Sequence, residues 1–136
     1  MGRTRAGGVK AAIVESLDAL AAKGVDPTSA VYARVFARWP ETERLFFRDH
    51  DNAIRAHMLF EVIEAVLDHA GPAHYARGYI ATERVHHIDD LGVSDDAYVG
   101  LFAVLRDVVA EALGDDWTPM MASAWADMIA DIAATV

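Results

Sequence analysis

The sequence predicts an all-α protein of six to seven helices that form a single domain over residues 1–136. Three observations support this prediction: apolar residues recur every three to four positions, Gly and Pro separate these runs, and no segment has the alternation of a β-strand. With 136 residues, of which 54% are hydrophobic, the chain is long enough for one substantial core. The short Gly-rich stretch 1–8 is expected to form a flexible arm.

Two helices and a short segment are expected in the first third of the chain. The first helix is expected over residues 9–23, because its apolar residues have helical spacing and Gly24 follows them. Asp26-Pro27 is typical of a helix start, and the second helix is expected to end at Pro40. A short segment over 41–47, rich in Leu and Phe, follows it.

A helix expected over residues 53–69 carries a regular apolar stripe. Its members share the spacing of one helix face: Leu59, Val62, Ile63, Val66 and Leu67. Arg55 lies one turn before Leu59, close to the centre of the same face. Because burying a guanidinium without a partner is costly, Arg55 is expected to meet an anion, a polar ligand or solvent.

A less regular helix, expected over 75–90, leads to two neighbouring histidines, His86 and His87. Histidine is the commonest protein ligand for metals, so either residue is a candidate ligand. Adjacent residues on a helix project about 100° apart, which makes it difficult for the pair to share one metal ion. Taken alone, the pair is more typical of a solvated surface than of a metal site.

Two long amphipathic helices are expected in the last third of the chain. Ser94 or Asp95 can cap the first of them, which ends at Gly114. Thr118-Pro119 is typical of the start of the second. Both have a wide apolar face, which predicts that they pack against the core.

The composition excludes several classes of function. The net charge of −9 argues against nucleic acid as a partner, because phosphate binding needs an excess of Lys and Arg. With no cysteine, the chain has no disulfide, thiolate metal site or thiol nucleophile. No uninterrupted apolar run approaches the ~20 residues of a membrane span, and the start fails as a signal peptide. A cytoplasmic protein without a membrane partner is therefore expected.

The residues resemble those of a bacterial single-domain globin, and are similar also to globin sensor domains. Residues 91–100, LGVSDDAYVG, look like the corner after the iron-ligating histidine in this family, and residues 114–125 look like its ending. Four further residues have the mutual spacing of four family positions, in order: Tyr32, Phe36, Pro40 and Phe46. The resemblance extends over nearly the whole chain and implies a globin-like fold with haem b, iron protoporphyrin IX, as cofactor.

The resemblance implies that His87 is the iron ligand, because its distance to Val93 matches the vertebrate form of the corner. His86 is the alternative. Most bacterial relatives have a shorter corner, which would place the ligand at Ile88, so this chain carries an insertion of one or two residues there. A ligating imidazole is expected to be neutral, with its other nitrogen donating a hydrogen bond.

The resemblance also assigns residues around the haem. On the distal side, Tyr32 is expected to donate its hydroxyl to the bound gas, and Arg55 stands where the family commonly has Gln or His. His57 is rejected as the distal residue, because Glu61 would then face the haem one turn later. The complete set of residues expected to bind the cofactor is Tyr32, Phe36, Phe46, Arg55, Leu59, Val62, His86, Val93, Tyr98 and Phe102.

The function implied is reversible binding of oxygen or another diatomic gas (O₂, NO or CO) at a five-coordinate iron, for oxygen transport or gas sensing. The chain is therefore expected not to be an enzyme. One alternative is NO dioxygenation, which would require a separate reductase because the chain has no Gly-rich βαβ fingerprint for a flavin or nicotinamide. Another is a haem-free globin-fold module for signalling or interaction. A homodimer and a signalling partner are further possibilities.

Overall fold

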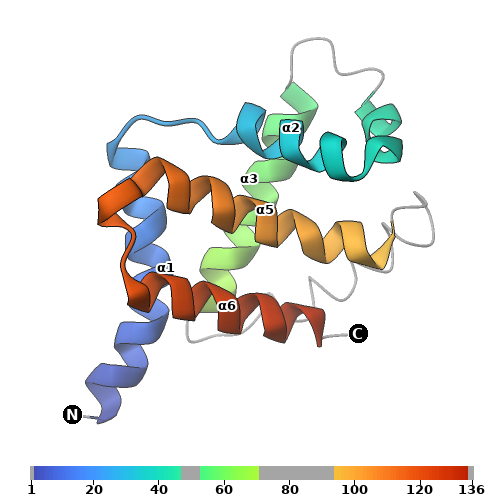
Figure 1. Ribbon diagram of the computed structural model, residues 1–136. Helices are drawn as coiled ribbons and strands as arrows, with labels where there is room; N and C mark the ends of the chain where they lie inside the picture. The colour runs from blue at the N-terminus through green and yellow to red at the C-terminus, as the bar shows by residue number, and fades with distance from the viewer. Residues whose placement is uncertain (1, 47–52, 71–93, 135–136) are drawn as a thin grey trace.

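The computed structural model describes residues 2–46, 53–70 and 94–134 (Figure 1). Within these ranges every regular element is helical, which confirms the all-α prediction. The elements are α1 (Gly2–Ala22), α2 (Thr28–Arg38), the 3₁₀ helix η1 (Pro40–Phe46), α3 (Ala53–Ala70), α5 (Asp95–Leu113), the 3₁₀ helix η3 (Gly114–Asp116) and α6 (Pro119–Ala133). The helix expected over 75–90 lies outside the described residues. No helix in the described ranges is long and apolar enough to cross a membrane.

The first helix begins earlier than its apolar spacing predicts. Residues 2–8, expected to form an arm, are the first turns of α1, and these turns project away from the other helices in Figure 1. The predicted mobility of this stretch stays a prediction. At its other end α1 finishes before Gly24, as expected, because φ at Gly24 is 71°, a value that glycine adopts without steric cost.

Asp26 stabilises the start of α2 by hydrogen bonds to its first residue, Thr28. Its carboxylate accepts hydrogen bonds from the Thr28 hydroxyl at 2.7 Å and from the Thr28 backbone N–H at 3.0 Å. The hydroxyl, and then the backbone N–H, hold the pKa of the Asp26 carboxyl below its usual value, since both favour the ionised form. The sequence therefore correctly places a helix start at this point.

The boundaries of α5 and α6 also follow local rules. Ser94, one of the two predicted caps, accepts a hydrogen bond from the backbone N–H of Ala97 at 3.0 Å. The helix α5 ends at Gly114, whose φ is 54°. Thr118 accepts a hydrogen bond from the backbone N–H of Met121 at 3.1 Å, and Pro119 is the first residue of α6.

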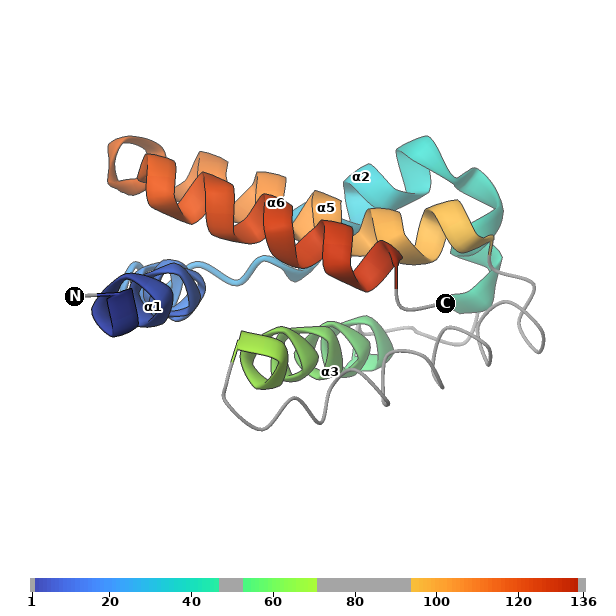
Figure 2. The same ribbon diagram turned by 90° about the horizontal axis from the view of Figure 1, so that it is seen from below.

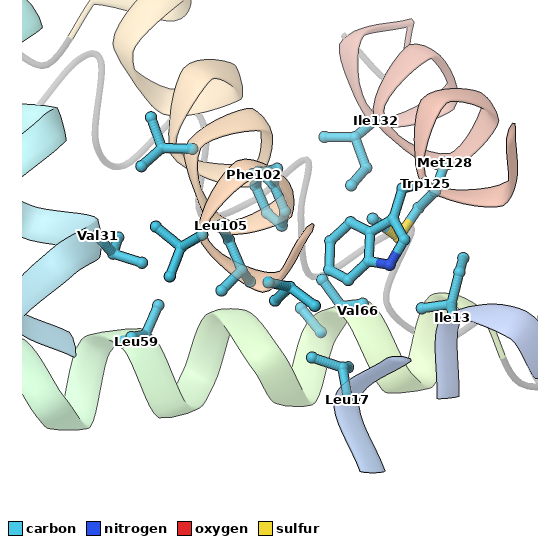
Figure 3. Packing of buried hydrophobic residues seen from close by; sticks show 14 of the residues in the cluster. Ile13, Leu17, Val31, Leu59, Val66, Phe102, Leu105, Trp125, Met128 and Ile132 are labelled. Carbon is cyan, nitrogen blue, oxygen red and sulfur yellow. The ribbon is translucent and has the colours of Figure 1, made fainter. Parts of the chain in front are cut away.

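The helices form two layers around one core. Figure 2 shows α5 and α6 side by side in one layer, with α1 and α3 in the layer below, and α3 crosses beneath α5 in Figure 1. Contacts between helices hold this arrangement together: α1 packs against α6 and α3, and α2 packs against α5. Figure 3 shows side chains from each of the described α-helices pointing into the same core: Ile13, Leu17, Val31, Leu59, Val66, Phe102, Leu105, Trp125, Met128 and Ile132.

The apolar stripe predicted on α3 is correct at its centre and wrong at one edge. Leu59 and Val66 are buried in the core, and Ile63 is half-buried. Leu67 is exposed, and Ala65 is buried instead. Neighbouring residues on a helix point about 100° apart, so a helix that turns Val66 fully inward turns Leu67 toward its flank.

One buried hydrogen bond joins the N-terminal and C-terminal helices. The indole Nε1 of Trp125 on α6 donates to Ser16 Oγ on α1 at 2.9 Å, and Ser16 Oγ donates to the backbone oxygen of Ile13 at 2.6 Å. Trp125 and Ser16 are both fully buried. The large indole ring therefore enters the core with its polar atom satisfied, which avoids the cost of burying an N–H group without a partner.

We expect Ser16→Ala to lower the free energy of unfolding by about 1–3 kcal/mol, because the Trp125 N–H would lose its acceptor inside the core. Denaturant unfolding measures this change. The control is Ser123→Ala on the exposed side of α6, which is expected to change stability by less than about 0.5 kcal/mol. In a Trp125→Phe background Ser16→Ala should cost much less; an equal cost in both backgrounds would show that the hydrogen bond is unimportant.

Candidate functional site

Three aromatic rings from α2 and η1 pack against one another and form what we call the aromatic cluster: Tyr32, Phe36 and Phe46. The ring centroids lie 5.7 Å apart for Tyr32 and Phe36, 5.3 Å for Tyr32 and Phe46, and 5.7 Å for Phe36 and Phe46. Tyr32 and Phe46 are buried, and Phe36 is half-buried. Tyr32 and Phe36 share a helix face because they are four residues apart.

The short helix η1 turns the chain so that Phe46 returns to α2. Pro40 cannot continue α2, and the chain enters a 3₁₀ helix at this residue. Thr42 fixes the turn, because its backbone N–H and its hydroxyl both donate to the backbone oxygen of Trp39, at 3.0 and 2.7 Å. Phe46, the last residue of η1, then packs against the Tyr32 ring in an edge-to-face arrangement.

Arg55 on α3 brings a positive charge onto the aromatic cluster. Its guanidinium carbon lies 5.2 Å from the ring centroid of Phe36 and 5.5 Å from that of Phe46, within the range of a cation–π contact. The Nε atom of Arg55 and the hydroxyl of Tyr32 are both buried. Two buried polar groups, the Arg55 Nε and the Tyr32 hydroxyl, therefore belong to residues that pack against aromatic rings.

Four further residues predicted to bind the cofactor lie on α3 and α5. On α3, Leu59 is buried and Val62 half-buried, one and two turns after Arg55. On α5, Tyr98 and Phe102 are buried with ring centroids 5.8 Å apart. All belong to the core or pack against it. The structure thus places the Tyr32, Phe36 and Phe46 rings in mutual contact. Arg55 lies against two of them, Phe36 and Phe46, and Tyr98 and Phe102 form a pair on α5.

Met58 is a residue of this face that the sequence prediction missed. It is half-buried and packs against the core from α3. The signal was present, since Met58 follows Arg55 by three residues and precedes Val62 by four, which is the spacing of a shared face. A stripe drawn from the branched aliphatic residues alone leaves it out.

The close approach of α2 to α5 was not predicted from the sequence. The indole ring of Trp39, which is buried, lies where a β-carbon on Gly100 would stand. The Nε1 atom of Trp39 donates to Asp96 at 3.1 Å, and the Arg38 guanidinium lies 4.7 Å from the ring centroid of Trp39. Because Trp39 directly precedes η1, this contact sets the position of the aromatic cluster relative to α5.

The predicted iron ligand His87, its alternative His86, and Val93 lie outside the described residues. Among residues whose side chains are described, no three His, Asp or Glu side chains gather as a metal site would require. His57, which was rejected as a distal residue, lies on the exposed side of α3, and its Nε2 is 3.0 Å from a carboxylate oxygen of Glu61. That placement agrees with the rejection.

Comparison with known proteins identifies the family. The family model for globins matches residues 29–136, which span the described helices from the second residue of α2 to the end of α6. This chain belongs to the globin family. Searches of the curated proteins and of the solved structures returned no match. The closer likeness to bacterial single-domain globins, and to globin sensor domains, stays a prediction.

The globin match gives the aromatic cluster a context. Globins pack their helices around a pocket that typically holds haem, and they are mostly gas binders rather than enzymes. The cluster and Arg55 lie within the matched part of the chain. Their roles at a haem stay predictions, which are taken up below.

We expect Gly100→Ala to lower the free energy of unfolding by about 1–3 kcal/mol, because the added methyl group would collide with the Trp39 ring. The sign is informative, since the same change inside a helix usually stabilises by about 0.5–1 kcal/mol. In a Trp39→Leu background the added methyl has room, and Gly100→Ala should become neutral or stabilising. Denaturant unfolding of the four proteins checks this; destabilisation in both backgrounds would rule out the collision.

Proposed function

We propose that this globin binds haem b beside the aromatic cluster and reversibly binds oxygen or another diatomic gas. The observation that carries the proposal is the convergence of Tyr32, Phe36, Phe46 and Arg55, from three different elements, in a chain that belongs to the globin family. Apolar rings suit a flat macrocycle, and the two buried polar groups suit a polar ligand held next to it.

The donor chemistry of these residues fits a haem site. Haem, when bound, supplies an iron atom that takes up the gas, with a reactivity set by its axial ligand and by the polarity of the distal pocket. The rings of the aromatic cluster exclude water from their side of the site. A haem-free module would more readily use aliphatic side chains here than a tyrosine and an arginine, since polar groups inside an apolar site typically serve to orient a ligand.

Tyr32 is the residue proposed to hold the gas. Its hydroxyl is buried, and inside a protein the dielectric constant is low, so a hydrogen bond is electrostatically stronger there than in water. A hydroxyl that donates to a polar diatomic molecule slows its escape. A less polar gas gains less from the same donor.

His87 is proposed as the iron ligand, with His86 as the alternative. The chain is proposed to act without turnover, as a carrier or sensor of the gas in the cytoplasm. NO dioxygenation would need electrons from a separate reductase, and a sensor would need a separate signalling partner. A homodimer is compatible with each of these roles.

We expect the purified protein loaded with haem to show a strong Soret band that His87→Ala removes and His86→Ala retains, because alanine cannot ligate iron. An absorption spectrum of each variant after haem reconstitution checks this. The reverse pattern would move the ligand to His86. No Soret band for the unaltered chain would overturn the haem proposal.

We expect Tyr32→Phe to speed oxygen dissociation by about tenfold, which corresponds to one hydrogen bond of ordinary strength. Stopped-flow displacement of oxygen by CO measures this rate. The association rate of CO serves as the control: CO is less polar, so this rate should change little. An unchanged oxygen rate would make Tyr32 a structural residue whose hydroxyl serves the protein alone.

A further inference from the structure

The Trp39 ring contacts α5 at two points. Its Nε1 donates to Asp96 Oδ2 at 3.1 Å, and the edge of its six-membered ring lies where a β-carbon on Gly100 would stand. Asp96 and Gly100 are four residues apart, so both lie on one face of α5. A ring held at both of its ends cannot shift along the helix without losing one of the two contacts.

Two charged groups strengthen the hydrogen bond of the Trp39 indole. Its acceptor is a carboxylate, and hydrogen bonds to ionised acceptors are roughly twice as strong as those between neutral groups. The guanidinium carbon of Arg38 lies 4.7 Å from the centroid of the Trp39 ring. A cation over the face of an indole draws electron density toward itself, which makes the ring N–H a better donor. Both effects favour a well-defined position for Trp39 on α5.

The position of Trp39 also determines where the aromatic cluster lies. The Trp39 backbone oxygen accepts hydrogen bonds from the N–H and the hydroxyl of Thr42, at 3.0 and 2.7 Å, and these bonds hold the start of η1. At the end of η1, the Phe46 ring packs against the Tyr32 ring with their centroids 5.3 Å apart. A shift of Trp39 along α5 would therefore move Phe46 relative to Tyr32.

We propose that Asp96 is a positioning residue for the gas site, and that it acts through Trp39. By holding Trp39, and with it η1, Asp96 fixes the Phe46 ring against Tyr32 and so the direction of the Tyr32 hydroxyl. This inference rests on the proposed function, since it requires haem and a gas beside the aromatic cluster. The strength of a hydrogen bond depends steeply on its angle, so a loosely supported donor holds the gas less well.

The test measures oxygen dissociation from the haem-loaded protein by stopped-flow displacement with CO. Asp96→Ala removes the acceptor of the indole hydrogen bond. We expect it to speed oxygen dissociation by about threefold to tenfold, because a loosely held Tyr32 hydroxyl recovers only part of its hydrogen bond to the gas. Asp96→Asn keeps an acceptor oxygen and loses only the charge, so it should restore most of the slow rate.

A matched control removes the same charge elsewhere on α5. Asp107 is exposed, and its carboxylate accepts a hydrogen bond from the neighbouring Arg106 at 3.0 Å. Asp107→Ala should leave the oxygen rate within about twofold, because solvent and salt screen exposed charges. An equal acceleration in Asp96→Ala and Asp107→Ala would overturn the inference, since it would show an effect of net charge alone.

A second background separates positioning from general stability. In Tyr32→Phe the hydroxyl is absent, so Asp96→Ala should change oxygen dissociation by less than about twofold there. An Asp96 that merely stabilises the fold would have the same effect in both backgrounds, and this result would overturn the inference.

An independent measurement follows the hydrogen bond itself. The Trp39 indole N–H gives one peak in a proton–nitrogen correlation spectrum of the CO complex, which Trp39→Phe identifies by its loss. In Asp96→Ala this peak should move upfield in the proton dimension, because the N–H has lost its acceptor. The peak should move less in Asp96→Asn and stay in place in Asp107→Ala. The same spectra show that each variant is folded.

The outcomes distinguish this inference from the proposed function. If the chain takes up no haem, the proposed function fails and the inference fails with it. If haem and oxygen bind and the indole peak moves, but Asp96→Ala leaves the oxygen rate unchanged, the proposed function stands and the positioning role of Asp96 is overturned. An indole peak that does not move would also overturn it, because Asp96 would then not hold Trp39 in solution.

Discussion

The close approach of α2 and α5 at Gly100 is the constraint on which the site depends. Only a residue without a side chain lets the Trp39 ring lie against α5, and the hydrogen bond to Asp96 fixes the ring's orientation. Trp39 is the last residue before η1, so its position determines where the chain turns and where Phe46 returns. The aromatic cluster is thus held by one packed ring and a glycine rather than by a network of polar groups.

The contact between α1 and α6 depends on a buried hydrogen bond. There the Trp125 indole, hydrogen-bonded to Ser16, joins the N-terminal and C-terminal helices within fully buried surroundings. This hydrogen bond and the Trp39–Gly100 contact tie different pairs of helices, α1 to α6 and α2 to α5. Both use a tryptophan ring, which brings a large apolar surface and one polar N–H group into the packing.

The sequence predicted what depends on neighbouring residues. The turns at Gly24 and Gly114 and the caps at Ser94 and Thr118 follow from backbone geometry and side-chain reach, so their positions were correct. The family spacing also brought Tyr32, Phe36 and Phe46 together. The contact of Trp39 with Gly100 and the exposure of Leu67 depend on how whole helices approach and rotate, which no local pattern encodes. Local pattern likewise does not choose between His86 and His87, because the two residues are neighbours in the sequence.

The negative net charge of the chain and the positive charge of Arg55 act on a ligand over different distances. A net charge of −9 repels an approaching anion, but this repulsion is screened over about 8 Å at physiological salt. Contact with a half-buried guanidinium acts at short range in a low dielectric, where salt screens far less. Any electrostatic effect of Arg55 on a ligand is therefore local and depends on direct contact at the site.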